Sequence, residues 1–135
     1  MPFHCSARPA AGRLIAALGL ALALGAGAAA LPSSAAAQGY GAIAFSPQTG
    51  QWGWSRNYRT RTAAAYVALA NCRSAALRGC RIVVQVRGAC ASLATGPAGW
   101  GAGWGNTQSR ANAEAMGNCR ASSQGCTTQV RFCAG

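Results

Sequence analysis

The sequence predicts an α+β fold made of a duplicated ββαβ unit, in which an antiparallel-rich sheet carries two helices packed on one face and disulfides hold the elements together. A repeated cysteine pattern is the first reason: Asn71-Cys72-Arg73, Gly79-Cys80 and Cys90 return as Asn118-Cys119-Arg120, Gly125-Cys126 and Cys133. The second reason is that, in both copies, an Ala-rich helical segment follows two strand-like runs and precedes a third.

The first copy begins with a predicted hairpin. In chain order it has a strand over residues 40–46, a turn at Pro47 and Gly50, a strand over residues 51–58, a helix over residues 63–73 and a strand over residues 81–87. Thr60 or Thr62 can cap the helix, because a hydroxyl before an Ala-rich run accepts a bond from a free helical N–H.

The second copy repeats this order. It has strands over residues 90–95 and 100–106 joined by a turn at Gly96, Pro97 and Gly99, then a helix that ends at Cys119 and a strand over residues 127–132. Thr107 or Ser109 is the predicted cap of this helix.

The N-terminal segment, residues 1–37, is predicted to be a secretory signal peptide that is cleaved near Ala37. Arg8 and Arg13 precede an apolar run over residues 14–31, and small residues follow it. A transmembrane anchor is the alternative, but the run is short and no basic flank follows it. We therefore expect a secreted or periplasmic protein with one domain, residues 38–135, made of repeats 38–90 and 91–135.

Six cysteines follow the leader, an even number that is typical of disulfides in a small exported domain. Because equivalent positions should pair equivalently, the duplication favours Cys72 with Cys80, Cys119 with Cys126, and Cys90 with Cys133. The third bond would then tie the two repeats together. We expect no metal or other cofactor, since the six cysteines lack Cys-x-x-Cys spacing and the only histidine is His4.

From residue 38 onward the chain has ten Arg, no Lys and no Asp, and Glu114 is its only acidic side chain, so the net charge is +9. Arginine forks match carboxylate and phosphate, so an anionic polymer or an acidic protein is a natural partner. The alternative is that the charge only keeps an exported domain soluble. The candidate binding residues are Arg56, Arg59, Arg61, Arg81, Arg87 and Arg131.

Strand alternation suggests where three of these arginines lie. Ile82, Val84, Val86, Val130 and Phe132 should face the helices, which leaves Arg81, Gln85, Arg87, Gln129 and Arg131 on an uncovered, basic face. Seven of the arginines belong to the first repeat, so binding should centre there. Replacing Arg81 and Arg87 together should weaken binding more than replacing Arg110 and Arg120.

The tryptophans allow two interpretations. Trp52 and Trp54 share one face of their strand with Arg56 and Tyr58, and Trp100 and Trp104 share one face of theirs. They could form an exposed row that stacks on sugars or bases. We favour the other interpretation, that they fill the core, because Ala-rich helices and the facing glycines offer little bulk.

Enzymatic activity is not expected. The chain after the leader has no His or Asp, and Glu114 alone cannot form a carboxylate pair. Two hypotheses remain, both for a monomer. The leading one is an exported non-enzymatic binding domain that engages an anionic extracytoplasmic partner through arginine, and the alternative is a structural or stress-protective envelope protein with no dedicated ligand.

The chain also resembles a known family over essentially all of residues 38–135. The residues that carry the resemblance are Tyr40-Gly41-Ala42-Ile43-Ala44-Phe45-Ser46, Gly50, Cys72, Gly79-Cys80 and Cys90 in the first half, and Gly103-Trp104-Gly105, Ala111, Ala113-Glu114-Ala115, Cys119 and Gly125-Cys126 in the second. In these it is similar to the domain of unknown function 4189 family. The resemblance implies a small exported bacterial Cys-rich domain and provides no catalytic residues.

Overall fold

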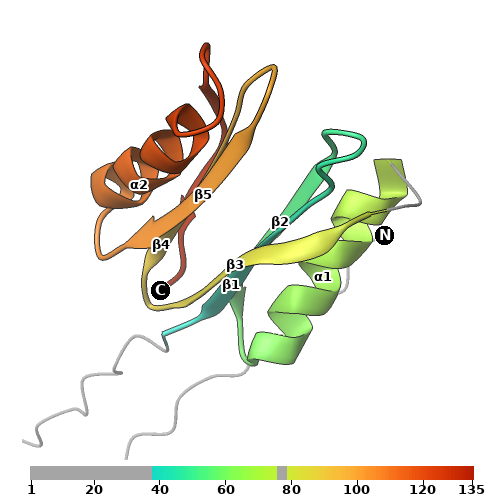
Figure 1. Ribbon diagram of the computed structural model, residues 1–135. Coiled ribbons are helices and arrows are strands. Elements are labelled where there is room, and N and C mark those ends of the chain that lie inside the picture. The colour runs from blue at the N-terminus through green and yellow to red at the C-terminus, as the bar shows by residue number, and fades with distance from the viewer. Residues whose placement is uncertain (1–37, 76–78) are drawn as a thin grey trace, which may run out of the picture. The chain divides into compact units, whose positions relative to one another are not determined.

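Two three-stranded antiparallel sheets, each with one helix, make up the structure, a computed structural model that describes residues 38–75 and 79–135 (Figure 1). The elements are β1 (Tyr40–Phe45), β2 (Trp52–Tyr58), α1 (Arg61–Ala75) and β3 (Arg81–Arg87) in the first unit, and β4 (Cys90–Thr95), β5 (Trp100–Gly105), α2 (Gln108–Arg120) and β6 (Thr127–Cys133) in the second. The duplicated ββαβ order is confirmed. The predicted signal peptide, residues 1–37, lies outside the described residues.

Each unit places its first strand in the middle of its sheet. The strand order is β2-β1-β3 in the first sheet and β5-β4-β6 in the second. The hairpin partner therefore lies on one side of the central strand, and the strand that follows the helix lies on the other. Both connections produce antiparallel pairs.

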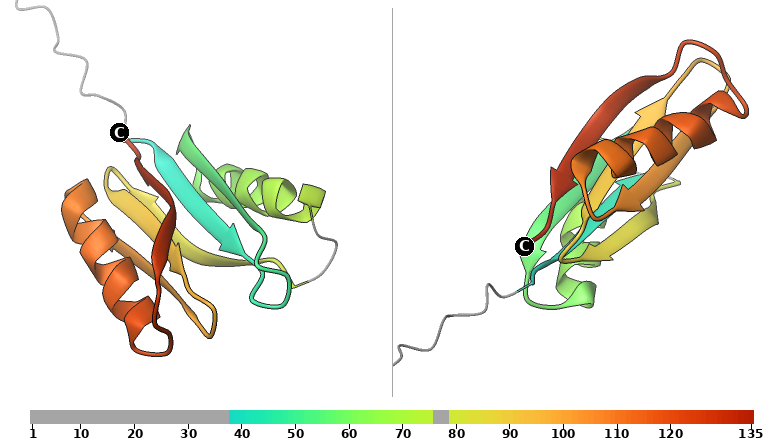
Figure 2. Two further views of the ribbon diagram at one scale, coloured as in Figure 1. Left: turned by 90° about the horizontal axis from the view of Figure 1, so that it is seen from above. Right: turned by 90° about the vertical axis from the view of Figure 1, so that its left-hand side faces the viewer.

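The helices lie on opposite outer faces, which corrects the prediction that both pack on one face of a single sheet. α1 packs on the strands of the first sheet and α2 on those of the second, and the two sheets face each other between them (Figure 2). The physical reason lies in the central strands, which are buried on both faces. In β1, Ala42 and Ala44 contact the helix while Ile43 and Phe45 face the other sheet. A strand that is apolar on both faces needs a layer on each side.

Small residues let each helix lie directly on a strand. A Cβ at Gly53 of β2 would meet the backbone of α1 at Ala68 and Cys72, and a Cβ at Gly101 of β5 would meet the backbone of α2 at Ala115 and Cys119. Only hydrogen fits at these two positions. The Ala-rich helices and the strand glycines are thus complementary halves of one packing scheme.

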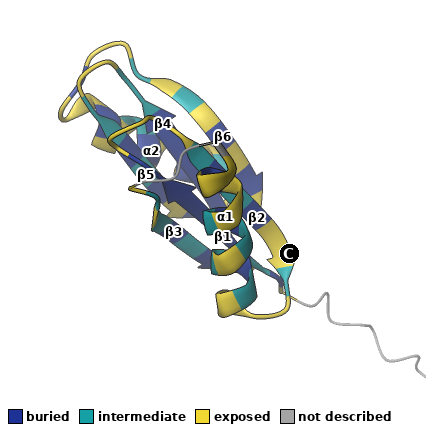
Figure 3. Cartoon of the chain, turned by 90° about the vertical axis from the view of Figure 1, so that its right-hand side faces the viewer, coloured by how far each residue is buried: buried dark blue, intermediate teal, exposed yellow. Residues whose placement is uncertain are grey.

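The large apolar side chains gather between the two sheets. Ile43, Leu93, Val130 and Phe132 belong to one buried cluster there, and Figure 3 shows the buried residues concentrated on the strands between the helices. The edges of this core are closed by aromatic pairs. Phe132 stacks on Trp54 of the opposite sheet with ring centroids 5.4 Å apart. Such cross-sheet contacts fasten the two units to each other.

A β-bulge in each unit changes the predicted strand faces. Ile43 pairs with Val84 but Ala44 pairs with Ile82, so Val83 is an extra residue in β3. β6 has the same irregularity opposite Leu93 and Ala94. An extra residue reverses the alternation beyond it.

The prediction of one uncovered face that holds all the polar positions is therefore wrong. Val84 and Val86 face the other sheet, while Ile82 packs against α1. Arg87 pairs with Tyr40 on the helix side of its sheet.

All three predicted disulfides are confirmed: Cys72–Cys80, Cys90–Cys133 and Cys119–Cys126. The role predicted for Cys90–Cys133 is wrong, because Cys90 begins β4 and pairs with Cys133 of β6 inside the second sheet. This bond closes one unit instead of joining two. The helix caps are Thr60, which accepts from Ala63 N at 3.1 Å, and Thr107, which accepts from Arg110 N at 3.2 Å.

Candidate functional site

The six candidate arginines are all exposed, but they are distributed over several places. The Arg56 guanidinium lies 5.8 Å from the centroid of the Trp54 ring, and that of Arg81 lies 5.6 Å from the centroid of Trp100. Arg61 is the first residue of α1. These arginines do not form one uniform basic surface.

Arg59 and Arg87 lie around one hollow at one end of the first sheet. They line a hollow of about 520 Å³ together with Tyr40 and Tyr58. The strand register explains the convergence, because Tyr40 of the central strand pairs with Tyr58 on one side and with Arg87 on the other. The Arg87 guanidinium lies 5.5 Å from the centroid of the Tyr40 ring. We call this group the Tyr40–Arg87 hollow.

Asn57 shapes this hollow through its backbone. It has φ of 62°, the left-handed region that Asn tolerates better than most residues. The β1–β2 register shifts by one residue here, so Asn57 lies in a bulge that redirects the chain before Tyr58 and Arg59. Its Oδ1 accepts a hydrogen bond from Gly135 N at 3.0 Å, which holds the chain end beside the hollow. Sequence reasoning missed Asn57, although an Asn within a strand pattern is a bulge signal.

Arg131 belongs to a different place, a groove between α2 and β6. The groove has a volume of about 610 Å³ and is lined by Gln108, Ser109, Asn112, Ala113, Met116, Gly117, Arg120 and Arg131. We call it the α2–β6 groove. Arg131 lies on the helix side of its sheet because it pairs with Ser92, whose hydroxyl bonds to Asn112 of α2.

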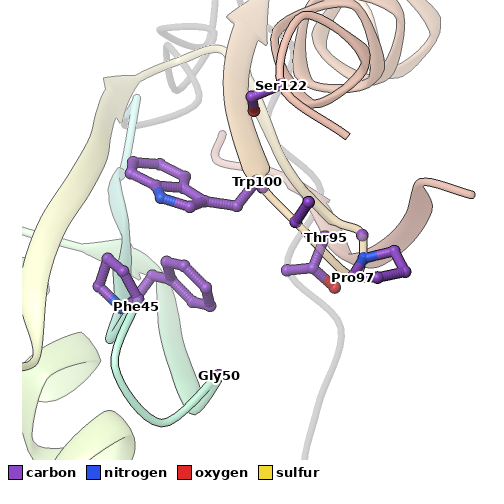
Figure 4. A pocket seen from close by; sticks show the side chains of 10 residues that line it. Phe45, Gly50, Thr95, Pro97, Trp100 and Ser122 are labelled. Carbon is purple, nitrogen blue, oxygen red and sulfur yellow. The ribbon is translucent and has the colours of Figure 1, made fainter. Parts of the chain in front are cut away.

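A third hollow, also of about 610 Å³, lies between the two hairpin turns. Figure 4 shows Phe45 on the side of the first sheet and Thr95 and Pro97 on the side of the second, with the Trp100 ring reaching toward Phe45. The Phe45 and Trp100 ring centroids are 5.2 Å apart. Trp100, which is half-buried, already contacts Phe45 and Arg81, so this hollow lies at one end of the inter-sheet core and its tryptophan ring is engaged in packing.

The residues around the Tyr40–Arg87 hollow offer two guanidinium groups and two phenols, with no acidic side chain among them. Such a set can hold a carboxylate or a phosphate by charge-assisted hydrogen bonds. Within residues 38–75 and 79–135, no group of three His, Cys, Asp or Glu side chains is arranged to hold a metal ion. No helix in this part of the chain is long and apolar enough to cross a membrane.

The family comparison agrees with the repeat geometry. A family model described as Domain of unknown function (DUF4189) matches residues 40–133, which span both sheets and both helices. The chain belongs to the DUF4189 family. No curated protein and no solved structure matches the chain.

In this DUF4189 domain, Glu114 and Trp104, which carry the family resemblance, and Asn118 of the repeated cysteine pattern have structural roles. Glu114 accepts a hydrogen bond from Trp104 N at 3.2 Å, and Asn118 Nδ2 donates to Ala102 O at 2.8 Å. Both bonds run from α2 to the open edge of β5, an edge strand. They satisfy backbone groups that would otherwise be free to pair with another chain.

The tryptophans of the DUF4189 domain mostly serve the core. Trp52, Trp54 and Trp100 are half-buried and pack against the inter-sheet cluster. Trp104 is 56% exposed. The core interpretation therefore holds for three of the four, and the interpretation as an exposed row does not.

Proposed function

We propose that this DUF4189 domain is an exported, non-enzymatic binding module that holds an anionic extracytoplasmic partner in the Tyr40–Arg87 hollow. The observation that carries the proposal is the convergence of Arg59 and Arg87 with two tyrosines around one hollow. The surrounding unit supports it, because residues 38–87 contain seven arginines and no acidic residue. A partner would be attracted to this unit before it reaches the hollow.

Export is part of the proposal. Residues 1–37 have the composition of a cleavable leader. The three disulfides support it, since such bonds persist in oxidising compartments. Intact mass of the secreted or periplasmic protein should correspond to a chain that starts at Gln38 with six thiol hydrogens missing. A retained leader or alkylatable thiols would contradict this.

The structure changes which arginines should be tested together. Arg81 and Arg87 are six residues apart on β3, about 20 Å at the usual rise of a strand. Arg81 contacts Trp100 of the other sheet, whereas Arg87 contacts Tyr40. A single small anion cannot engage both. Arg59 and Arg87 are the pair that one ligand can bridge.

The decisive experiment compares two double variants with the same loss of charge. The oxidised protein, purified after expression of the full chain, is titrated calorimetrically with inorganic tripolyphosphate, a polyphosphate too short to reach from Arg81 to Arg87. Arg59→Gln with Arg87→Gln should weaken binding by about tenfold or more, whereas Arg56→Gln with Arg81→Gln should weaken it less. Single exposed ion pairs contribute only about 0–1 kcal/mol, so a larger loss requires groups that act on one ligand.

Salt dependence provides the second readout. Neutralising several ligand charges makes affinity fall steeply as salt rises, and the Arg59 and Arg87 variant should flatten that slope. Equal losses from the two double variants, with circular dichroism unchanged, would mean unspecific charge attraction and would remove the case for a site. That outcome would favour the structural or stress-protective role, which the contacts of Arg56 with Trp54 and of Arg81 with Trp100 would also suit.

A further inference from the structure

A polar trio forms the floor of the α2–β6 groove. Thr128 Oγ1 donates a hydrogen bond to Asn112 Oδ1 at 2.6 Å. Ser92 Oγ shares its one proton between the same oxygen, at 3.1 Å, and Val130 O, at 3.3 Å. Ser92 is fully buried, so this is an interior contact between β4, β6 and α2. The two hydroxyls hold the Asn112 amide in one orientation.

The first unit shows what the fold itself requires at these positions. The disulfides and the strand registers align the units, so that Ser92 corresponds to Ala42 and Thr128 to Ile82. Counting seven residues back from Cys119 and from Cys72 makes Ala65 the counterpart of Asn112. The first unit forms the same sheet and helix with three apolar residues. The polar trio is therefore not needed for folding.

A buried polar network also adds little to stability. Its hydrogen bonds replace bonds to water, and an apolar replacement of all partners is often neutral or stabilising. What the trio does provide is a fixed position for the Asn112 side chain. With Oδ1 held by two hydroxyls on the sheet side, Asn112 presents its Nδ2 donor to the groove, which it lines together with Arg120 and Arg131.

The other groups around the groove define what would fit there. Gln108 is held as well, because its Nε2 donates to Ala91 O at 3.4 Å. Side-chain amides and the Ser109 hydroxyl match the hydroxyl groups of a sugar. Arg120 and Arg131 match a carboxylate. Met116 adds a polarizable apolar surface for the C–H face of a sugar ring.

We propose that the α2–β6 groove is a second binding site and that it takes a carboxylated sugar. Arg120 and Arg131 hold the carboxylate, and the Asn112 Nδ2 donor bonds to a ring hydroxyl. The site does not depend on the Tyr40–Arg87 hollow, because the two share no residue. It relies on fixed geometry more than on charge, since the second unit has only three arginines against Glu114.

The test uses three probes on the oxidised protein obtained from the full chain. Trigalacturonic acid carries both chemistries, maltotriose carries only hydroxyls, and tricarballylate carries only carboxylates. In nuclear magnetic resonance titrations, trigalacturonic acid should shift the Asn112 side-chain amide signals and bind at least about tenfold tighter than either of the other probes. Equal binding of tricarballylate would overturn the proposal in favour of plain charge attraction.

Two variants separate binding from folding. Ser92→Ala, Asn112→Ala and Thr128→Ile together rebuild the floor as the first unit has it, so this triple variant should stay folded and lose at least about tenfold in affinity for trigalacturonic acid. Asn112→Asp keeps the acceptor for both hydroxyls but replaces the Nδ2 donor with an anionic oxygen, and should also lose binding. Unchanged affinity in either variant would overturn the proposal.

The Arg59→Gln and Arg87→Gln double variant is the matched control. It should bind trigalacturonic acid as the parent does, while it loses polyphosphate. If it loses both probes and the triple variant loses neither, the groove is not a site and the hollow binds both ligands. If the Arg59→Gln and Arg87→Gln double variant still binds polyphosphate but the groove variants lose trigalacturonic acid, the proposed function is wrong and the proposed groove site is supported.

Discussion

The first unit, β1 to β3 with α1, and the second unit, β4 to β6 with α2, follow one plan but stabilise it differently. Where the second unit has the Cys90–Cys133 disulfide, the register of the first places Tyr40 opposite Arg87. The ring contact of that pair is a cation–π interaction. The same strand position thus carries a covalent bond in one unit and an exposed arginine over a tyrosine ring in the other.

The shared features show what the fold needs. Each helix lies on a strand through a glycine, Gly53 or Gly101, and each is bonded near its end to the residue that precedes the following strand by an equivalent disulfide. Asn71 and Asn118 make the same bond from helix to edge strand. The features that differ, including the arginines and the polar trio of the groove, are not required by the fold.

Removing a disulfide should have the largest effect. The separation is 43 residues for Cys90–Cys133 but 8 for Cys72–Cys80. Replacing the first pair by Ala should lower the free energy of unfolding by about 4 kcal/mol, and the second pair by about 2.5 kcal/mol, because the entropy of loop closure grows with loop length. Guanidinium denaturation measures both. A larger loss of stability from the Cys72–Cys80 replacement would show that loop length does not determine the contribution of these disulfides.

Substitution of the glycine that lies under α2 should have the next largest effect on stability. Gly101→Ala places a methyl group against the α2 backbone and should cost about 1–3 kcal/mol of unfolding free energy by overpacking. Gly53→Ala should cost a similar amount in the first unit. Thermal unfolding with matched circular dichroism checks both. A neutral result at either position would mean that this helix does not lie directly on its strand.

Glu114 tests how the edge of β5 is protected. Its counterpart in α1 is Val67, so Glu114→Val makes the second unit resemble the first. The loss of the Trp104 N–H partner should cost about 0.5–1.5 kcal/mol, the usual contribution of one hydrogen bond. Glu114→Gln keeps an acceptor and is the control. The Val variant should also exchange the Trp104 amide proton faster, and unchanged exchange would contradict the assigned role.

Gly117 should give the smallest change, in the opposite direction. It lies within α2 with open space around its Cα, and its counterpart in α1 is Ala70. Gly117→Ala should raise the free energy of unfolding by about 0.5–1 kcal/mol, because glycine loses more backbone entropy in a helix. A decrease in stability would indicate a close neighbour that the structure does not show.

Much of this fold was predictable because the repeated residues, such as Cys, Gly and Thr, determine structure within a few positions of themselves in the sequence. Cysteine spacing, strand alternation and Thr107 before a helix gave the elements, their order and the disulfide pairs. The layer arrangement was not predictable in the same way. It depends on β1 being buried on both faces. In the sequence, the Ala residues of that strand do not indicate a contact, but in the structure they pack against α1, which lies on Gly53.

The site residues were predictable in type but not in grouping. The excess of arginine pointed to the first unit. The grouping of these arginines, however, depends on the strand register and on a bulge at Val83, which the alternation of apolar and polar residues in the sequence does not reveal. Arg81 and Arg87 share parity in the sequence and lie in different surroundings in the structure. Asn112 was missed because its significance comes from Ser92 and Thr128, which are distant in sequence.

We propose that the two units, which share one fold, present two separate binding surfaces. The most direct test is a pair of ¹H–¹⁵N titrations of the oxidised protein, one with polyphosphate and one with trigalacturonic acid. Polyphosphate should shift the amides of Tyr40, Tyr58, Arg59 and Arg87, and trigalacturonic acid should shift Asn112, Arg120 and Arg131. If both probes move the same residues, or if shifts spread evenly over all exposed arginines, the two units do not have separate sites.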